Sequence, residues 1–197
     1  MDSYKTIDET IIGEGYYTEK RSKFLAYAHH VETVDQAKSI IAGYRKKYYD
    51  ARHCCYAYVL GPNGEDFRAN DDGEPSSTAG KPIMGQIASH ELTNILICVI
   101  RYYGGVNMGT GGLIVAYRTA ASDAIEHCKI ITRLVEEQVV FRFTYPMMNG
   151  VMGIVKDMQP KIISQTFDND CEIVLSIRKS RAEELRNRLN GLTFGGQ

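Results

Sequence analysis

The sequence predicts an α+β protein in two parts, residues 1–132 and 133–197. A continuous apolar run at residues 95–100, rich in β-branched side chains, is typical of a strand covered on both faces. An amphipathic helix follows this run. Residues 138–189 then read strand, helix, strand, strand, helix, which is the order of a ferredoxin-like split βαβ fold. The pattern therefore indicates two α+β domains in succession.

Local signals place the other elements of the first part. Residues 3–31 read as strands, interrupted by glycines and by a charged turn at residues 19–23. Thr33 is predicted to cap a helix over residues 34–48. Gly-Pro-Asn-Gly at residues 61–64 predicts a hairpin turn between two strands.

Two further helices are expected on either side of the apolar run. Pro82 suits a first helical turn, which predicts a helix from about Lys81 to His90. Thr110 is predicted as the N-cap of a helix that ends near Lys129. The inward face of this second helix is expected to consist of Leu113, Tyr117, Ala120, Ala121, Ala124 and Cys128.

In the second part, the expected strands are 138–145, 161–167 and 171–178, and the expected helices are 146–158 and 180–189. Thr193-Phe194 is the only candidate for a last strand, as a stub. Four methionines are expected to face the sheet as core residues, namely Met147, Met148, Met152 and Met158.

The composition is that of a globular protein without strong net charge. Its 23 basic and 24 acidic side chains leave a net charge of −1, so nothing global marks a nucleic-acid binder. The five cysteines include no CxxC pair and are expected to be reduced thiols in a cytoplasmic protein. No signal peptide and no apolar run of membrane-spanning length is apparent. We therefore expect no membrane partner, and the sequence leaves the oligomeric state open.

The glycines between residues 104 and 112 mark one candidate site. A strand, a glycine loop and a helix N-terminus form a geometry that binds phosphate through backbone N–H groups. Gly104 and Gly109 have the Walker spacing, but Thr110 stands where that motif requires lysine. The alternative is a tight turn between a strand and a capped helix, which the glycines alone favour.

An acidic turn, Asp71-Asp72-Gly73-Glu74-Pro75, marks another candidate site. Its carboxylates could hold Mg²⁺ or accept hydrogen bonds from a ligand. Alternatively, its Asp side chains accept hydrogen bonds from nearby backbone N–H groups.

The segment His53-Cys54-Cys55 invites a metal-site interpretation. Adjacent side chains on a strand point to opposite faces, however, so only His53 and Cys55 share a face. No second ligand pair has zinc-like spacing. We therefore predict no metal site and no cofactor.

The most patterned segments of the chain are Ser22-Lys23-Phe24, Ala51-Arg52-His53, Asp71-Asp72-Gly73-Glu74-Pro75, Thr78-Ala79-Gly80-Lys81-Pro82, Arg101-Tyr102-Tyr103-Gly104-Gly105, Gly109-Thr110-Gly111-Gly112-Leu113 and Ala116-Tyr117. Together, and in this order, they resemble the signature of the YigZ/IMPACT family. The resemblance covers essentially the whole chain. The sequence departs from the family pattern at Asn107 and Val115, where the family is often basic.

This resemblance implies both a fold and a role. The implied fold is a ribosomal protein S5 domain 2-like β/α domain, followed by a ferredoxin-like domain similar to one in the ribosomal translocation factor. Eukaryotic relatives regulate translation by binding the activator of an initiation-factor kinase. For bacterial relatives, nucleic-acid or ribosome binding is proposed from the fold.

The resemblance also implies that the acidic turn and the 101–112 loop face one groove. The residues predicted to bind a ligand or partner there are Asp71, Asp72, Glu74, Thr78, Lys81, Arg101, Tyr102, Gly104, Gly105, Thr110, Gly111 and Gly112. Possible nucleic-acid contacts are predicted at Lys23, Arg178, Lys179 and Arg181.

The expected function is that of a regulatory binding protein associated with translation. Its partner would be the ribosome, RNA or a translation-related protein. The alternative is a small hydrolase or phosphate-handling enzyme that uses the same groove. The sequence identifies no histidine partner for Ser76, Ser77 or Thr78, and therefore no catalytic pair for this alternative.

Overall fold

A computed structural model describes residues 2–168 and 170–194. The chain divides into two compact units. The larger spans Tyr4–Arg133, and the smaller consists of the chain from Leu134 onward with the few residues that precede Tyr4. The α+β architecture in two parts that the sequence predicts is confirmed.

The elements of the first part are β1 (Ser3–Ile7), β2 (Gly13–Glu19), β3 (Ser22–His30), α1 (Val34–Lys47), β4 (His53–Leu60), β5 (Asp66–Asn70), α2 (Gly80–Ser89), β6 (Ile95–Tyr102), α3 (Gly109–Glu126) and β7 (Ile130–Leu134). Five of the strands form one sheet in the order β2-β3-β6-β4-β5, and β1 pairs with β7 in a separate sheet. Thr33 caps α1 as predicted, because its side chain accepts a hydrogen bond from the N–H of Gln36.

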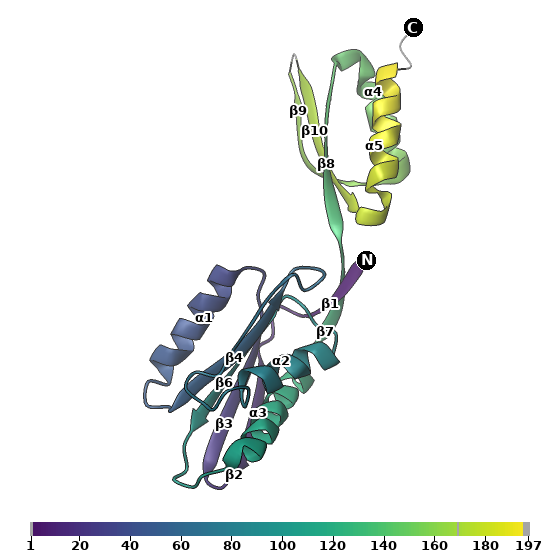
Figure 1. The fold of residues 1–197 in the computed structure, drawn as a ribbon. Helices are drawn as coiled ribbons and strands as arrows, with labels where there is room; N and C mark the ends of the chain where they lie inside the picture. Colours follow the sequence, from purple (N-terminus) through teal and green to yellow (C-terminus); the bar gives the residue numbers. More distant parts are fainter. Residues whose placement is uncertain (1, 169, 195–197) are drawn as a thin grey trace. The chain divides into compact units, whose positions relative to one another are not determined.

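Strand β6 lies at the centre of the five-stranded sheet and pairs antiparallel with both neighbours. Val99 in β6 lies opposite Ala26 of β3 on one side and Cys55 of β4 on the other. Helices α2 and α3 cover one face of the sheet, and α1 covers the other (Figure 1). This explains the continuous apolar run, since neither face of β6 meets water.

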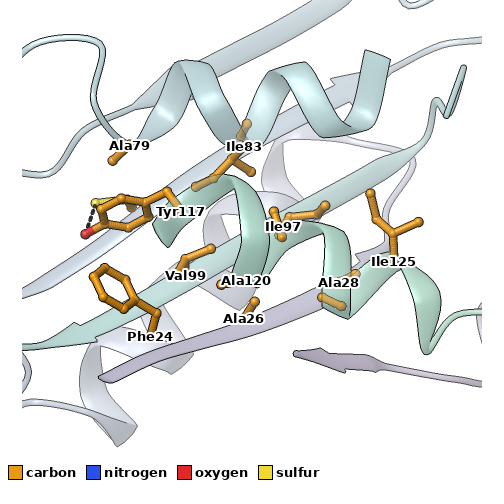
Figure 2. Close-up of a cluster of buried hydrophobic side chains, with 14 of the residues drawn as sticks. Phe24, Ala26, Ala28, Ala79, Ile83, Ile97, Val99, Tyr117, Ala120 and Ile125 are labelled. Carbon is orange, nitrogen blue, oxygen red and sulfur yellow. Dashed lines mark hydrogen bonds between the residues drawn. The ribbon is translucent and has the colours of Figure 1, made fainter. Parts of the chain in front are cut away.

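The core between the sheet and α3 combines small and large side chains (Figure 2). Ala26 and Ala28 on β3 leave room for the helix, and Tyr117 of α3 packs beside Phe24 of the same strand. The rings of Phe24 and Tyr117 meet edge to face, with their centroids 5.1 Å apart. This alternation lets the helix approach the sheet without leaving voids.

The elements of the second part are β8 (Glu136–Phe143), the short 3₁₀ helix η1 (Tyr145–Met147), α4 (Met148–Met158), β9 (Lys161–Phe167), β10 (Cys171–Arg178) and α5 (Lys179–Phe194). The sheet order is β8-β10-β9, with both pairings antiparallel. Strands β8 and β9 therefore run parallel on either side of β10, with α4 between them in the chain. This is the split βαβ arrangement of a ferredoxin-like fold.

Two details of the second part differ from the sequence prediction. Thr193 does not form a strand stub, because α5 continues to the end of the described chain. Met158 is buried as expected, whereas Met152 is 36% exposed. The buried face of α4 is set by Val151, Ile154 and Val155, and the helical period turns Met152 away from it.

No helix among the described residues is long and apolar enough to span a bilayer. All five cysteines are free thiols.

We expect Gly15→Ala to destabilise the larger unit by about 1–3 kcal/mol, because overpacking displaces backbone that cannot yield easily. A Cβ at Gly15 would lie 2.4 Å from the backbone nitrogen of Ala124 and 2.5 Å from the carbonyl oxygen of Ala120, both in α3. The free energy of unfolding in urea measures the effect.

Gly43→Ala is the matched control. A Cβ at Gly43, in α1, would meet nothing within 4 Å, so this change should stabilise the protein by about 0.5–1 kcal/mol. Equal effects of the two substitutions would contradict the close packing of β2 on α3.

Candidate functional site

A buried ion pair lies beneath the loop that follows β6. Oε1 of Glu74 accepts hydrogen bonds from Nη1 of Arg101 at 2.6 Å and from the hydroxyl of Tyr117 at 2.7 Å. The exposed fractions of these residues are 8%, 5% and 0%. Glu74, Arg101 and Tyr117 form what we call the buried carboxylate network. They join the acidic turn, the end of β6 and the third turn of α3.

Aromatic and hydroxyl groups hold the guanidinium of Arg101. Its Cζ lies 5.6 Å from the ring centroid of Phe24 and 5.4 Å from that of Tyr103, within cation–π range. Its Nη2 lies 3.5 Å from Oγ of Ser22, which also accepts a hydrogen bond from the N–H of Gly104. Nε of Arg101 has no hydrogen-bond partner among the described residues.

The glycine loop lies directly on the β2–β3 hairpin turn. A Cβ at Gly104 would lie 2.2 Å from the carbonyl carbon of Arg21. Lys20 and Arg21 form this turn with positive φ angles of 46° and 65°. The loop therefore needs glycine at position 104 for close packing, as the strand-to-helix turn interpretation implies.

A histidine and a cysteine that were not among the predicted site residues line the same network. Nε2 of His53 lies 3.7 Å from Oε1 of Glu74. Sγ of Cys55 lies 3.4 Å from the hydroxyl of Tyr117, and this hydrogen bond is the dashed line at Tyr117 in Figure 2. Nδ1 of His53 lies 2.7 Å from the carbonyl oxygen of Asp72, so Nδ1 carries the proton that donates there. Burial raises the pKa values of Cys55 and Tyr117, which keeps both groups protonated.

The sequence held one signal for these residues, namely that His53 and Cys55 share a strand face. Their proximity to Glu74 depends on the register of β4 against β6, in which His53 lies opposite Arg101. Among the described residues, no group of three or more His, Cys, Asp or Glu side chains is placed to hold a metal ion.

Much of the acidic turn is bonded within the fold. Oδ1 of Asp71 accepts hydrogen bonds from the N–H groups of Ala79 and Gly80 at 3.1 and 2.8 Å, and its Oδ2 accepts one from Ser77. Asp71 therefore caps the start of α2 with its carboxylate. The hydroxyl of Thr78, which is buried, donates to the carbonyl oxygen of Pro75. These bonds agree with the structural alternative for the turn.

Other predicted site residues lie on the opposite face of the sheet, beneath α1. Oδ2 of Asp72 accepts from the N–H of Cys54 at 2.7 Å, and its Oδ1 pairs with Arg45 at 3.1 Å. Tyr102 packs among the residues under α1 and lies directly opposite Lys23 in the neighbouring strand. The structure therefore separates Asp72 and Tyr102 from Arg101.

The hydroxyl of Tyr102 donates to Oδ1 of Asp50 at 2.8 Å. Desolvation and this hydrogen bond to a carboxylate raise the pKa of Tyr102 to about 12.

The remaining predicted residues lie in the glycine loop and in the first turns of α2 and α3. Lys81, Gly105, Thr110 and Gly111 are exposed, and Gly112 is half-buried. The prediction that Thr110 caps α3 is wrong, because the helix begins at Gly109 with Met108 at the cap position. Oδ1 of Asn107 accepts the N–H of Gly109 at 3.2 Å, so the side-chain acceptor comes from an earlier residue than expected.

Two of the three basic residues predicted in the smaller unit line a cavity of about 350 Å³. Arg178 and Arg181 line it together with Lys161. Nε of Arg178 lies 3.3 Å from Oδ2 of Asp2, and Nε of Arg181 lies 3.5 Å from Oε2 of Glu184. Lys179 begins α5 and is exposed, but it does not line this cavity.

Comparison of the sequence with known proteins identifies the family of this chain. The model of the Impact N-terminal domain matches residues 20–125, the segment that contains the buried carboxylate network. The chain belongs to the IMPACT family. It is 37% identical over 195 residues to the IMPACT family member YvyE of Bacillus subtilis, covering 99% of this chain and 89% of that protein. It is 28% identical to YigZ of Escherichia coli, covering 89% and 87% of the two chains.

A solved structure described as a hypothetical protein has the same arrangement of elements. It aligns with a TM-score of 0.75 at 27% identity, covering all of this chain and 95% of the other. The family resemblance carried by the sequence motifs is therefore confirmed.

We expect Glu74→Gln to destabilise the larger unit by about 3–5 kcal/mol, because it leaves the charge of Arg101 buried without its counter-ion. Urea denaturation followed by circular dichroism measures the change in the free energy of unfolding.

Glu91→Gln is the matched control. Glu91 pairs with Lys5 at 2.8 Å, but both side chains are largely exposed. This control should change the free energy of unfolding very little. A Glu74→Gln protein as stable as the Glu91→Gln protein would show that the buried pair has no structural role.

Proposed function

We propose that this IMPACT-family protein is a regulatory binding protein of the translation apparatus that acts in the cytoplasm. Its partner is the ribosome, RNA or a translation-related protein. Family membership supports the association with translation, through the role that the sequence resemblance implies.

The observation that carries the proposal is that the charged groups of the predicted site form hydrogen bonds and ion pairs with other parts of the protein. Glu74 and Arg101 neutralise each other beneath the loop, and Asp71 is bonded to backbone N–H groups. These groups build a rigid support for the acidic turn and the glycine loop. A rigid surface loses little conformational entropy when a partner binds, which favours a binding role.

We therefore expect exposed residues around this support to contact the partner. Tyr103 is 50% exposed, and Lys81 and Thr110 are also exposed. The side chain of Lys81 has no ion pair within the described chain. It is therefore free to meet a phosphate or a carboxylate of the partner.

The net charge of −1 constrains how such binding can work. A chain without global positive charge gains little indiscriminate affinity for a polyanion. Binding therefore depends on a few local contacts and on shape, which suits one specific docking position better than coating of RNA.

Ribosome co-sedimentation of the purified protein across a salt series tests the proposal. We expect binding at low salt that weakens as salt rises, with a slope set by the few phosphate contacts. Salt-insensitive binding would assign a ribosomal protein surface as the docking site. No sedimentation with ribosomes at low salt, together with no translation-related protein in a pull-down, would overturn the proposal.

We expect Lys81→Ala to weaken ribosome binding and to lower the salt slope by about one, because one phosphate contact is lost. Its thermal unfolding should match that of the wild type, since the side chain is exposed. Lys38→Ala is the control, because Lys38 is an exposed lysine on α1, at the other face of the sheet. Equal binding by the two variants would remove Lys81 from the contact surface.

A further inference from the structure

A concave site lies in the larger unit where α1 ends and β4 begins. It is a cavity of about 290 Å³, lined chiefly by Arg45, Tyr48, Tyr49, Arg52, His53 and Asp72. We call it the tyrosine–arginine pocket. Its volume is just below the usual range for small-ligand sites.

The pocket presents an aromatic surface to solvent. Tyr49 is 84% exposed, although an apolar ring of this size usually finds cover in a folded protein. The ring of Tyr48 beside it is half-buried and stacks against Tyr44, with centroids 6.3 Å apart and planes 16° apart. Tyr48 is therefore fixed, and Tyr49 is free to stack on a planar ligand.

Of the two arginines that line the pocket, only Arg52 has a positive charge that is not neutralised by a carboxylate of the described chain. Arg45 is paired with Asp72 at 3.1 Å, and the other carboxylate oxygen of Asp72 accepts the N–H of Cys54. The backbone of Arg52 is held by its N–H, which donates to the carbonyl oxygen of Arg101. Its guanidinium has no ion pair within the described chain, so it can receive an anion.

We propose that the tyrosine–arginine pocket binds a nucleotide unit, with the base stacked on Tyr49 and the phosphate paired with Arg52. The inference rests on the proposed binding function and names the chemistry of one contact. A free mononucleotide and a nucleotide within single-stranded RNA present this same chemistry.

The surroundings of the pocket favour a nucleotide within a strand. Tyr102 lies next to Tyr48, with ring centroids 6.4 Å apart, and Lys23 lies opposite Tyr102 on the neighbouring strand. Nζ of Lys47 lies 5.1 Å from the ring centroid of Tyr48. Lys23 and Lys47 thus extend the positive charge beyond the pocket, whereas Asp50 is engaged by the hydroxyl of Tyr102. Cations interleaved with aromatic rings match the alternation of phosphates and bases in a single strand.

The test uses the full chain and a fluorescein-labelled single-stranded RNA of twelve nucleotides, with binding read by fluorescence anisotropy at low salt. AMP and UMP are titrated in parallel by calorimetry. If the RNA binds more tightly than either mononucleotide, the ligand is single-stranded RNA. Equal or tighter binding of a mononucleotide assigns a free nucleotide.

Variants then locate the contact. Tyr49→Ala should weaken binding about tenfold, because the loss of base stacking has an effect of this size, whereas Tyr49→Phe should bind normally. Arg52→Ala should weaken RNA binding and lower the salt slope by about 0.7, the value for one contact with a single strand.

Matched controls lie elsewhere in the molecule. Tyr145 is 69% exposed, and Arg68 is exposed on β5, opposite Tyr58 near the far end of β4. Tyr145→Ala and Arg68→Ala should bind like the wild type.

The proposal is overturned if neither mononucleotide nor RNA binds the wild type at low salt. It is also overturned if the Tyr49 and Arg52 variants bind as the controls do. Ribosome co-sedimentation separates this failure from that of the proposed function. A protein that sediments with ribosomes but binds no nucleotide retains its role in translation and loses only this pocket.

Discussion

The ion pair between Glu74 and Arg101 links the acidic turn to the central strand of the larger sheet. An unpaired charge in a site this dry would be strongly destabilising, and a bare pair recovers only part of the lost hydration. Tyr117 supplies the carboxylate with a second donor, and the rings of Phe24 and Tyr103 flank the guanidinium. The acidic turn, the end of β6 and the start of α3 are thereby fixed together. Displacing the acidic turn or the end of β6 would leave a buried charge without its counter-ion, and displacing α3 would remove a hydrogen-bond donor from Glu74.

The left-handed backbone conformation of two residues in the acidic turn also has a physical cause. Asp72 and Ser77 adopt positive φ angles of 41° and 62°, which are unfavourable for residues other than glycine. The turn must present Glu74 to the interior, Asp71 to the start of α2 and Asp72 to the N–H of Cys54. Several charge-assisted hydrogen bonds offset the strain of two left-handed residues. The acidity of the turn is therefore explained by its internal bonds.

Local signals in the sequence predicted the elements well, because each depends on neighbouring residues. The apolar run at 95–100, the cap at Thr33 and the hairpin turn at 61–64 are such cases, and the structure confirms them. The pairing of Glu74 with Arg101 spans 27 positions and depends on the packing of three elements, so no local pattern encodes it. The cap of α3 was misplaced for a different reason, since Asn107 competes with Thr110 as the acceptor. Family motifs identify residues by their positions in the sequence, but they do not indicate which face of the sheet each residue occupies.

The period of a strand explains the division of the predicted site. Arg101 and Tyr102 are consecutive in β6, so their side chains must point to opposite faces. Arg101 is turned toward α3 and completes the buried carboxylate network, whereas Tyr102 joins the aromatic residues beneath α1. One sequence motif thus contributes to two surfaces with different chemistry. The first is held rigid by an internal salt bridge, and the second keeps Tyr49 and Arg52 at its surface. Strand β6 therefore connects the buried carboxylate network, through Arg101, to the aromatic residues beside the tyrosine–arginine pocket, through Tyr102.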